Sequence, residues 1–146
     1  MNKRRATLSD VPVLVELRKL QLLDEGGGLP PDNELAAYFT KAIEADTFVS
    51  WVMEEENGII ATSGVCFYSQ PPSYRNPSGR VAYITNMYTK PMYRRRGIAA
   101  ELLSAVIDEA EARECTRIWL HTSVHGKSIY QKAGFVDLDG YMALKS

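Results

Sequence analysis

The segment of this sequence best suited to bind an anion is a run of three arginines followed by a glycine and small residues. Arg94, Arg95 and Arg96 stand before Gly97, and an amphipathic helical pattern begins at Ile98. The first amides of a helix have no partner within it, and the helix dipole places partial positive charge there. Gly97 lets the backbone approach a ligand, and guanidinium groups are forked donors that suit phosphate. The pattern predicts a pyrophosphate or polyphosphate site, with a solvated basic turn as the alternative.

Two other phosphate-binding motifs are excluded by the residues present. Gly126-Lys127-Ser128 resembles the end of a P-loop, but that motif requires a glycine at position 121, where the chain has His121. The dinucleotide fingerprint G-x-G-x-x-G does not occur. The anion site is therefore expected at residues 94–100 alone.

The composition predicts a single globular domain over residues 1–146. Of these 146 residues, 17 are Lys or Arg and 18 are Asp or Glu, which gives a net charge of −1 and argues against a nucleic-acid partner. No apolar run is long enough for a membrane span, and none follows the basic N-terminus as in a signal peptide, so a cytoplasmic protein is expected. Cys66 and Cys115 lack metal-ligand spacing and are expected to be buried thiols, with no metal.

The hydrophobic periodicity predicts alternating helices and strands that could position this segment. Helices are expected at residues 11–23, 32–43, 98–110 and 127–133. Strands are expected at residues 48–53, 59–68, 81–89 and 117–122, with a closing antiparallel pair at 135–136 and 141–144. Ser9 or Asp10 is expected to cap the first helix. The proline-rich stretch 70–79 is expected to be a loop.

Three segments, in this order, resemble motifs of the GCN5-related N-acetyltransferase (GNAT) superfamily. Residues 94–99 are similar to its Q/R-x-x-G-x-G/A acetyl-CoA motif. Residues 87–91 resemble the strand that leads into it, and residues 129–135 resemble the downstream LY-x-K-x-GF segment. The opening at 7–17 and the order of elements also fit. The resemblance implies a mixed α/β (α+β) fold whose central, mostly antiparallel sheet has two splayed parallel strands and about four flanking helices.

The resemblance further implies acetyl-CoA as co-substrate, inserted between the strands at 81–89 and 117–122. Its pantetheine would pair with the backbone of residues 87–89, where an amide of Met87 or Tyr88 would stabilise the oxyanion. Ser123 stands where relatives often carry an asparagine that contacts the cofactor. The cofactor-binding residues expected on this basis are Met87, Tyr88, Thr89, Arg94, Arg95, Arg96, Gly97, Ile98, Ala99, Ala100 and Ser123.

The family passes the acetyl group directly to an amine, so the resemblance implies no protein nucleophile. Tyr130 is expected to be the general acid that protonates the CoA thiolate. The alternative for Tyr130 is a packing role beside Ile129 and Phe135.

No carboxylate marks the general base, because Thr85-Asn86 stands where many relatives have one. His125 is the catalytic candidate chosen here, since histidine has a suitable pKa. His121, or a water held by Thr85, Asn86 or Tyr83, is the alternative.

The resemblance places the amine acceptor among the loops at 22–33, 70–79 and 137–141. The first and third of these loops contain acidic residues that suit a cationic amine, with a solvated surface charge as the alternative for each; they are Asp24, Glu25, Asp32, Asp137 and Asp139. The acceptor, a small molecule or a peptide amine, is not named by the sequence. A non-catalytic acyl-CoA-binding or regulatory module is the alternative function, and both a monomer and a homodimer are left open.

Overall fold

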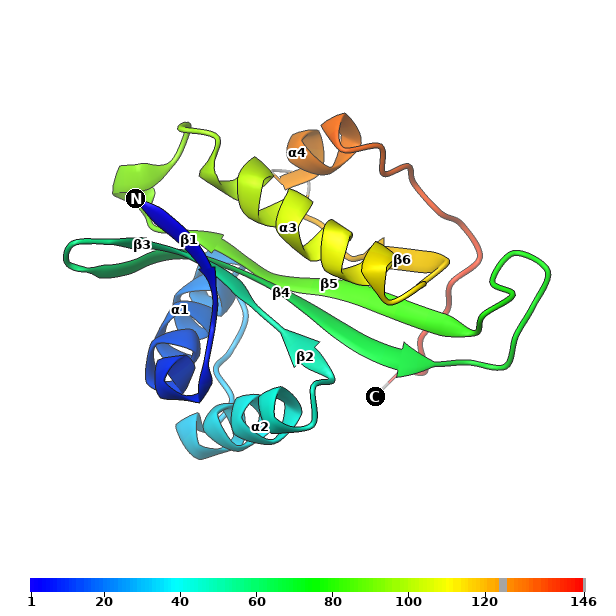
Figure 1. Ribbon diagram of the computed structural model, residues 1–146, viewed down its shortest axis with the longest axis horizontal. Helices are drawn as coiled ribbons and strands as arrows, with labels where there is room; N and C mark the ends of the chain where they lie inside the picture. Colours follow the sequence, from blue (N-terminus) through cyan, green and yellow to red (C-terminus); the bar gives the residue numbers. More distant parts are fainter. Residues whose placement is uncertain (124–125, 146) are drawn as a thin grey trace.

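The computed structural model describes residues 1–123 and 126–145, and within them the chain forms a six-stranded sheet flanked by helices (Figure 1). The strands are β1 (Asn2–Arg5), β2 (Phe48–Val49), β3 (Trp51–Glu55), β4 (Gly58–Ser69), β5 (Arg80–Thr89) and β6 (Arg117–Leu120). The helices are α1 (Val11–Asp24), α2 (Asp32–Glu44), α3 (Ile98–Ala112) and α4 (Lys127–Lys132), with short 3-10 turns η1 (Leu8–Asp10) and η2 (Pro91–Tyr93).

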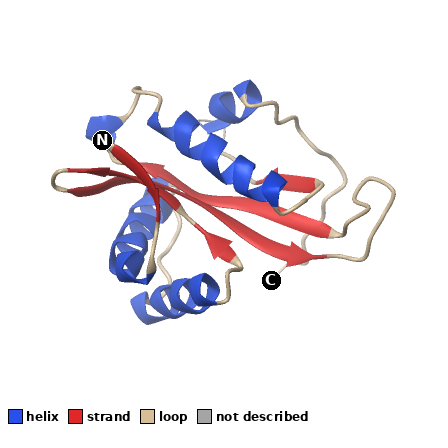
Figure 2. Ribbon diagram, viewed as in Figure 1, coloured by secondary structure: helices blue, strands red, loops and turns tan. Residues whose placement is uncertain are grey.

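The helices cover the two faces of the sheet as two separate layers (Figure 2). α1 and α2 pack on one face, where Leu14, Phe39 and Phe48 belong to one buried cluster. α3 packs on the other face, where Leu103 and Val106 join a second cluster that includes Ile84 and the partly buried α4 residues. The sheet is therefore the middle layer of three.

The strand order is β1-β3-β4-β5-β6, with β2 paired to β4. All pairs are antiparallel except β5 with β6, which run parallel from Val81 opposite Arg117 to Ile84 opposite Leu120. β5 continues to Thr89 without β6 beside it, so the two parallel strands separate after Ile84. This mixed, mostly antiparallel sheet with splayed parallel strands and four helices confirms the fold class that the sequence predicts.

A β-bulge lies where the strands separate. Thr62 is opposite Tyr88 but Gly64 is opposite Thr85, so β5 has one residue more than β4 in this interval. Asn86 takes the left-handed conformation (φ 58°) and is buried, and its carbonyl accepts a hydrogen bond from Thr62 Oγ1 at 2.9 Å. A Cβ on Gly64 would lie 2.7 Å from the Phe48 ring and 3.1 Å from Asn86 Cβ, so the bulge requires a glycine opposite it.

The closing antiparallel pair predicted at residues 135–136 and 141–144 is wrong, since neither segment forms a strand. Tyr141 stacks on Trp119 of β6 with ring centroids 5.5 Å apart, and Val136, Met142 and Leu144 are exposed. Apolar alternation predicts a strand only if a partner strand or an apolar layer receives it. Among the described residues, β6 pairs on one side only, with β5.

The start of α1 also differs from the prediction, because no side chain caps this helix. η1 comes before α1, and Asp10 makes no side-chain cap to α1. Its carboxylate instead accepts from the amide of Thr7 at 2.7 Å and from the Arg4 guanidinium at 2.8 and 2.9 Å. Arg4 also binds Glu54 of β3. Asp10 therefore ties the first strand to the start of the helical layer.

Substituting Asp10 by asparagine is expected to lower the free energy of unfolding at pH 7. Hydrogen bonds from Arg4 hold the pKa of Asp10 at about 2, against 3.8 ordinarily, a difference of about 2 kcal/mol in stability. Because this pKa is depressed, the contribution is present above pH 3.8 and is lost as the pH falls through about 2. Urea unfolding of both proteins between pH 2 and pH 7 measures it.

Asp46→Asn is the matched control for Asp10→Asn. Asp46 also bonds to arginines, Arg5 and Arg113, but its side chain is 68% exposed, so the expected loss is below about 1 kcal/mol. Equal losses for the two variants, or a loss at Asp10 that does not vary with pH, would contradict the expectation.

Candidate active site

A cleft of about 670 Å³ opens where β5 continues beyond β6. The end of α1, the last residues of β5, the turn before α3 and helix α4 line it. Ten of the predicted cofactor-binding residues are in its lining, namely Met87, Tyr88, Thr89, Arg94, Arg95, Gly97, Ile98, Ala99, Ala100 and Ser123. Tyr130 also lines the cleft, whereas Arg96 does not. The fold thus brings together residues that are far apart in the sequence.

The turn into α3 presents free backbone donors to this cleft. Arg95 and Gly97 both take left-handed conformations, with φ of 65° and 78°, and Gly97 is the residue before the first turn of α3. Among the described residues, the amides from 95 to 100 donate to no backbone carbonyl. A Cβ on Gly97 would meet no atom within 4 Å, which means that this position faces open space. The geometry suits an anion held by main-chain amides.

The arginines of this turn are used in different ways. Arg94 donates from Nε to the carbonyl of Thr89 at 2.8 Å and from Nη2 to Asp24 at 3.1 Å, so it joins the turn to β5 and α1. Arg96 lies over the Tyr93 ring, 5.4 Å from its centroid, outside the cleft lining. Arg95 alone combines a place in the cleft lining with no ion pair among the described residues.

Tyr130 reaches the cleft from α4. Its ring packs edge-on against Phe135 with centroids 6.1 Å apart, and its hydroxyl makes no hydrogen bond within the described residues. Burial is the main reason why the pKa of Tyr130 is raised, and the charges of Glu25 and Tyr83 raise it further. The hydroxyl therefore keeps its proton at neutral pH and has a hydrogen free to donate.

The candidates for a general base are distributed on the α1 face of β5 and β6. The Tyr83 hydroxyl is 2.9 Å from Nδ1 of His121, and Thr85 Oγ1 accepts from Arg18 at 3.4 Å. Asn86 is buried in the bulge. His125, the predicted catalytic histidine, lies outside the described residues.

Three polar side chains, two on α1 and one directly after it, were not recognised as a set from the sequence. Arg18 Nη1 donates to Gln21 Oε1 at 3.2 Å, and Gln21 Nε2 donates to Glu25 Oε1 at 3.4 Å. Gln21 and Glu25 line the cleft. The spacing of three and four residues, on a helix whose other inward positions are apolar, is the signal that could have indicated this row.

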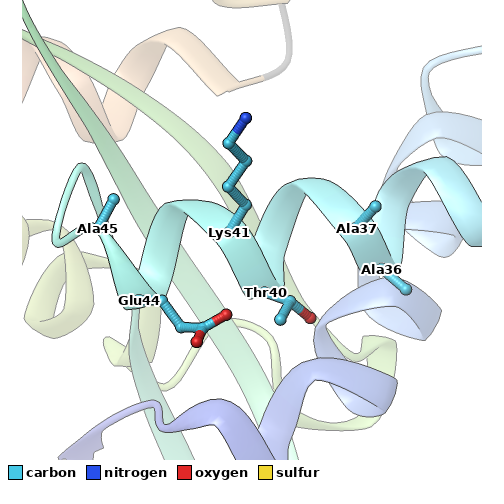
Figure 3. A pocket seen from close by; sticks show the side chains of 6 residues that line it. All are labelled: Ala36, Ala37, Thr40, Lys41, Glu44 and Ala45. Carbon is cyan, nitrogen blue, oxygen red and sulfur yellow. The ribbon is translucent and has the colours of Figure 1, made fainter.

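A second hollow of about 610 Å³ lies over α2 and shares no lining residue with the cleft (Figure 3). It is lined by residues of α2 and the following Ala45 only, and Lys41 and Glu44 point to different sides of the helix. Polar groups from several elements do not converge there, so it lacks the features of a binding site.

No cluster of three or more metal-binding side chains occurs within residues 1–123 and 126–145. In the same residues, the longest apolar helices are too short or too polar to cross a membrane. Both cysteines are free thiols: Cys115 is buried, and Cys66 is half-buried with its Sγ 3.2 Å from the Tyr38 hydroxyl.

Comparison with solved structures defines the class of this fold. A predicted acetyltransferase from Clostridium acetobutylicum, in a crystal structure with acetyl-CoA, is 42% identical, with a TM-score of 0.93 over 99% of this chain and 95% of that one. A GCN5-related N-acetyltransferase from Ralstonia eutropha JMP134 is 22% identical (TM-score 0.84; 99% and 97% covered). The glucosamine-6-phosphate N-acetyltransferase of Arabidopsis thaliana is 21% identical (TM-score 0.75; 99% and 97% covered). These two share the fold.

The sequence itself matches the model of the acetyltransferase (GNAT) family over residues 14–135. No curated protein has significant sequence similarity to the chain. The family match spans most of the chain and includes α1, the cleft and α4, so the protein belongs to the acetyltransferase (GNAT) family and is an N-acetyltransferase.

Proposed function

We propose that this protein transfers an acetyl group from acetyl-CoA directly to the primary amine of an acceptor molecule. The observation that carries the proposal is the cleft between the separated ends of β5 and β6, which combines a turn rich in free amides with the Tyr130 hydroxyl. The similarity to an acetyltransferase crystallised with acetyl-CoA supports acetyl-CoA as the co-substrate.

The cofactor would bind mainly to the protein backbone. Beyond Ile84, β5 has no partner strand on the side of β6, so residues 87–89 can pair with the amide groups of pantetheine. The pyrophosphate would lie against the amides of residues 95–100, where the dipole of the α3 helix favours negative charge. Arg95 would add charge from the side chain, while Arg94 fixes the turn through Thr89 and Asp24.

The transfer needs two proton movements and no covalent enzyme intermediate. The acceptor nitrogen attacks the thioester carbonyl carbon, a C–N bond forms, and the carbonyl oxygen becomes negative beside an amide of Met87 or Tyr88. The C–S bond then breaks, and the CoA sulfur takes the proton of the Tyr130 hydroxyl. A base removes the proton of the amine, and our candidates are His125, the hydrogen-bonded pair of Tyr83 and His121, or a water held there.

Calorimetric titration with acetyl-CoA tests the cofactor site without any assumption about the acceptor. We expect saturable binding of one acetyl-CoA per chain, followed by release of free CoA thiol when an amine panel is added. Absence of binding at high acetyl-CoA concentration would overturn the proposal. Tight binding with no transfer to any amine would instead favour the non-catalytic acyl-CoA-binding module.

A further inference from the structure

Arg18 of α1 is a half-buried cation without an acidic partner in the described part of the chain. Its hydrogen bonds there come from Nη1 alone and go to neutral oxygens, Gln21 Oε1 and Thr85 Oγ1. The half-buried Arg4 and Arg113 both bind carboxylates, at 2.8 and 2.9 Å respectively. A partly desolvated guanidinium with free donors is suited to bind an anion that arrives from outside the protein.

The charge of Arg18 acts on the open part of the sheet face, next to the place where β5 and β6 separate. Burial is the main cause of the raised pKa values of Tyr38, Cys66 and Tyr83, and the charge of Arg18 opposes the rise at all three. These groups come from α2, β4 and β5. Arg18 therefore lies among them, on the face that also carries the pair of Tyr83 and His121.

Helix α1 runs from Arg18 toward the part of the cleft that holds Glu25 and Tyr130. Gln21 bonds to both Arg18 and Glu25, and the charge of Glu25 contributes to the raised pKa of both Tyr83 and Tyr130. Seven residues of α-helix span roughly 10 Å, at about 1.5 Å per residue. An acceptor with its amine near Tyr130 would thus reach Arg18 only if it carried an anionic group within about 10 Å of the nitrogen.

We propose that Arg18 is a specificity-determining residue that binds an anionic group, a carboxylate or a phosphate, on a small amine acceptor. The Nε and Nη2 donors of Arg18 bind the anionic oxygens, while the amine lies at the Glu25 and Tyr130 end of the row. This inference rests on the proposed function, because it names the class of acceptor for the same site.

Matched amines that differ in the anionic group test the proposal. The probes are 6-aminohexanoate against 6-aminohexanamide for a carboxylate, and 6-aminohexyl phosphate against 6-amino-1-hexanol for a phosphate, because these chains are long enough to separate the anion from the amine as the helix requires. We expect kcat/KM to be about tenfold or more higher for the anionic member of at least one pair. Arg18→Met should abolish that preference by raising KM for the anionic amine, Arg18→Lys should retain part of it, and the neutral amine should be acetylated equally by all three proteins.

Lys41→Met is the control, since it removes the same charge from the exposed surface of α2 (Figure 3). It should leave the preference unchanged. Equal rates for both members of each pair, or an equal loss for both in Arg18→Met, would overturn the role of Arg18.

A binding measurement separates this inference from the proposed function. With CoA bound, propionate or methyl phosphate should shift one arginine Nε–Hε NMR signal saturably, and that signal should be missing from Arg18→Met. Acetyl-CoA binding with no such anion-dependent shift overturns the inference and leaves the proposed function standing. Failure of acetyl-CoA to bind overturns the proposed function instead.

Discussion

Replacement of Tyr130 by phenylalanine is expected to lower kcat for acetyl transfer by roughly 100-fold or more. The change removes only the hydroxyl and keeps the ring, whose edge-on packing against Phe135 holds α4 in place. Without the hydroxyl, the CoA thiolate must leave unprotonated, which is less favourable. Acetyl-CoA affinity should be almost unchanged, because the amides of residues 95–100 hold the pyrophosphate. Steady-state kinetics and calorimetry on the same preparation measure the two effects.

The pH dependence gives an independent check on Tyr130. Burial raises the pKa of its hydroxyl above the ordinary value of 10.0, so the proton required of an acid is present throughout the neutral range. Titration of Tyr130 should therefore cause no loss of rate below pH 10. A fall in rate at acidic pH would instead report protonation of the general base. Tyr74→Phe, at a tyrosine that is 99% exposed, is the control. A Tyr130→Phe enzyme as active as the control would remove Tyr130 from the mechanism.

Gly97→Val is expected to raise the Kd for acetyl-CoA by about tenfold or more. A Cβ at Gly97 would enter empty space in the cleft lining, where the cofactor is proposed to lie against the backbone. The φ of 78° adds strain of about 1–2 kcal/mol for any residue with a side chain. Calorimetric titration should therefore show weak binding, together with a modest loss of stability.

Gly58→Val separates the strain from the steric effect. Gly58 also has a positive φ, 120°, and a Cβ on it would likewise meet no atom within 4 Å, but it is the first residue of β4, next to the turn that follows β3. Its substitution should lower stability and leave acetyl-CoA affinity intact. If the Gly97 and Gly58 variants bind acetyl-CoA equally well, the pyrophosphate does not lie at this turn.

The sequence predicts the parts of the fold that depend on local patterns. The apolar spacing in residues 98–110 lies within α3, and Asn57 lies in the turn between β3 and β4, with Gly58 as the first residue of β4. The closing pair at residues 135–144 was predicted wrongly, because alternation shows which side chains would share a face but not whether a strand is there to receive them. Nothing in the residues around Asn86 signals a bulge, which depends on Gly64 in the neighbouring strand.

The candidate site was predictable to a similar extent. The turn at residues 94–100 carries a continuous motif, and all of its residues except Arg96 line the cleft. Arg94 joins the turn to α1 through its hydrogen bond to Asp24, a residue 70 positions away, and no local pattern in the sequence predicts that contact. Arg18 was missed for the same reason, since its neighbours on β4 and β5 become apparent only after folding.

The extra residue at Asn86 changes which positions of β5 face each helical layer. Before it, Ala82 and Ile84 pack with α3; after it, Met87 packs with that same layer and Tyr88 packs with α1. If Asn86 took a regular position in the strand instead, strict alternation would exchange the faces of Met87 and Tyr88. No single substitution could compensate for that exchange. One inserted residue between Thr85 and Tyr88 would cause the same exchange, so this part of β5 should resist insertion even where its side chains tolerate replacement.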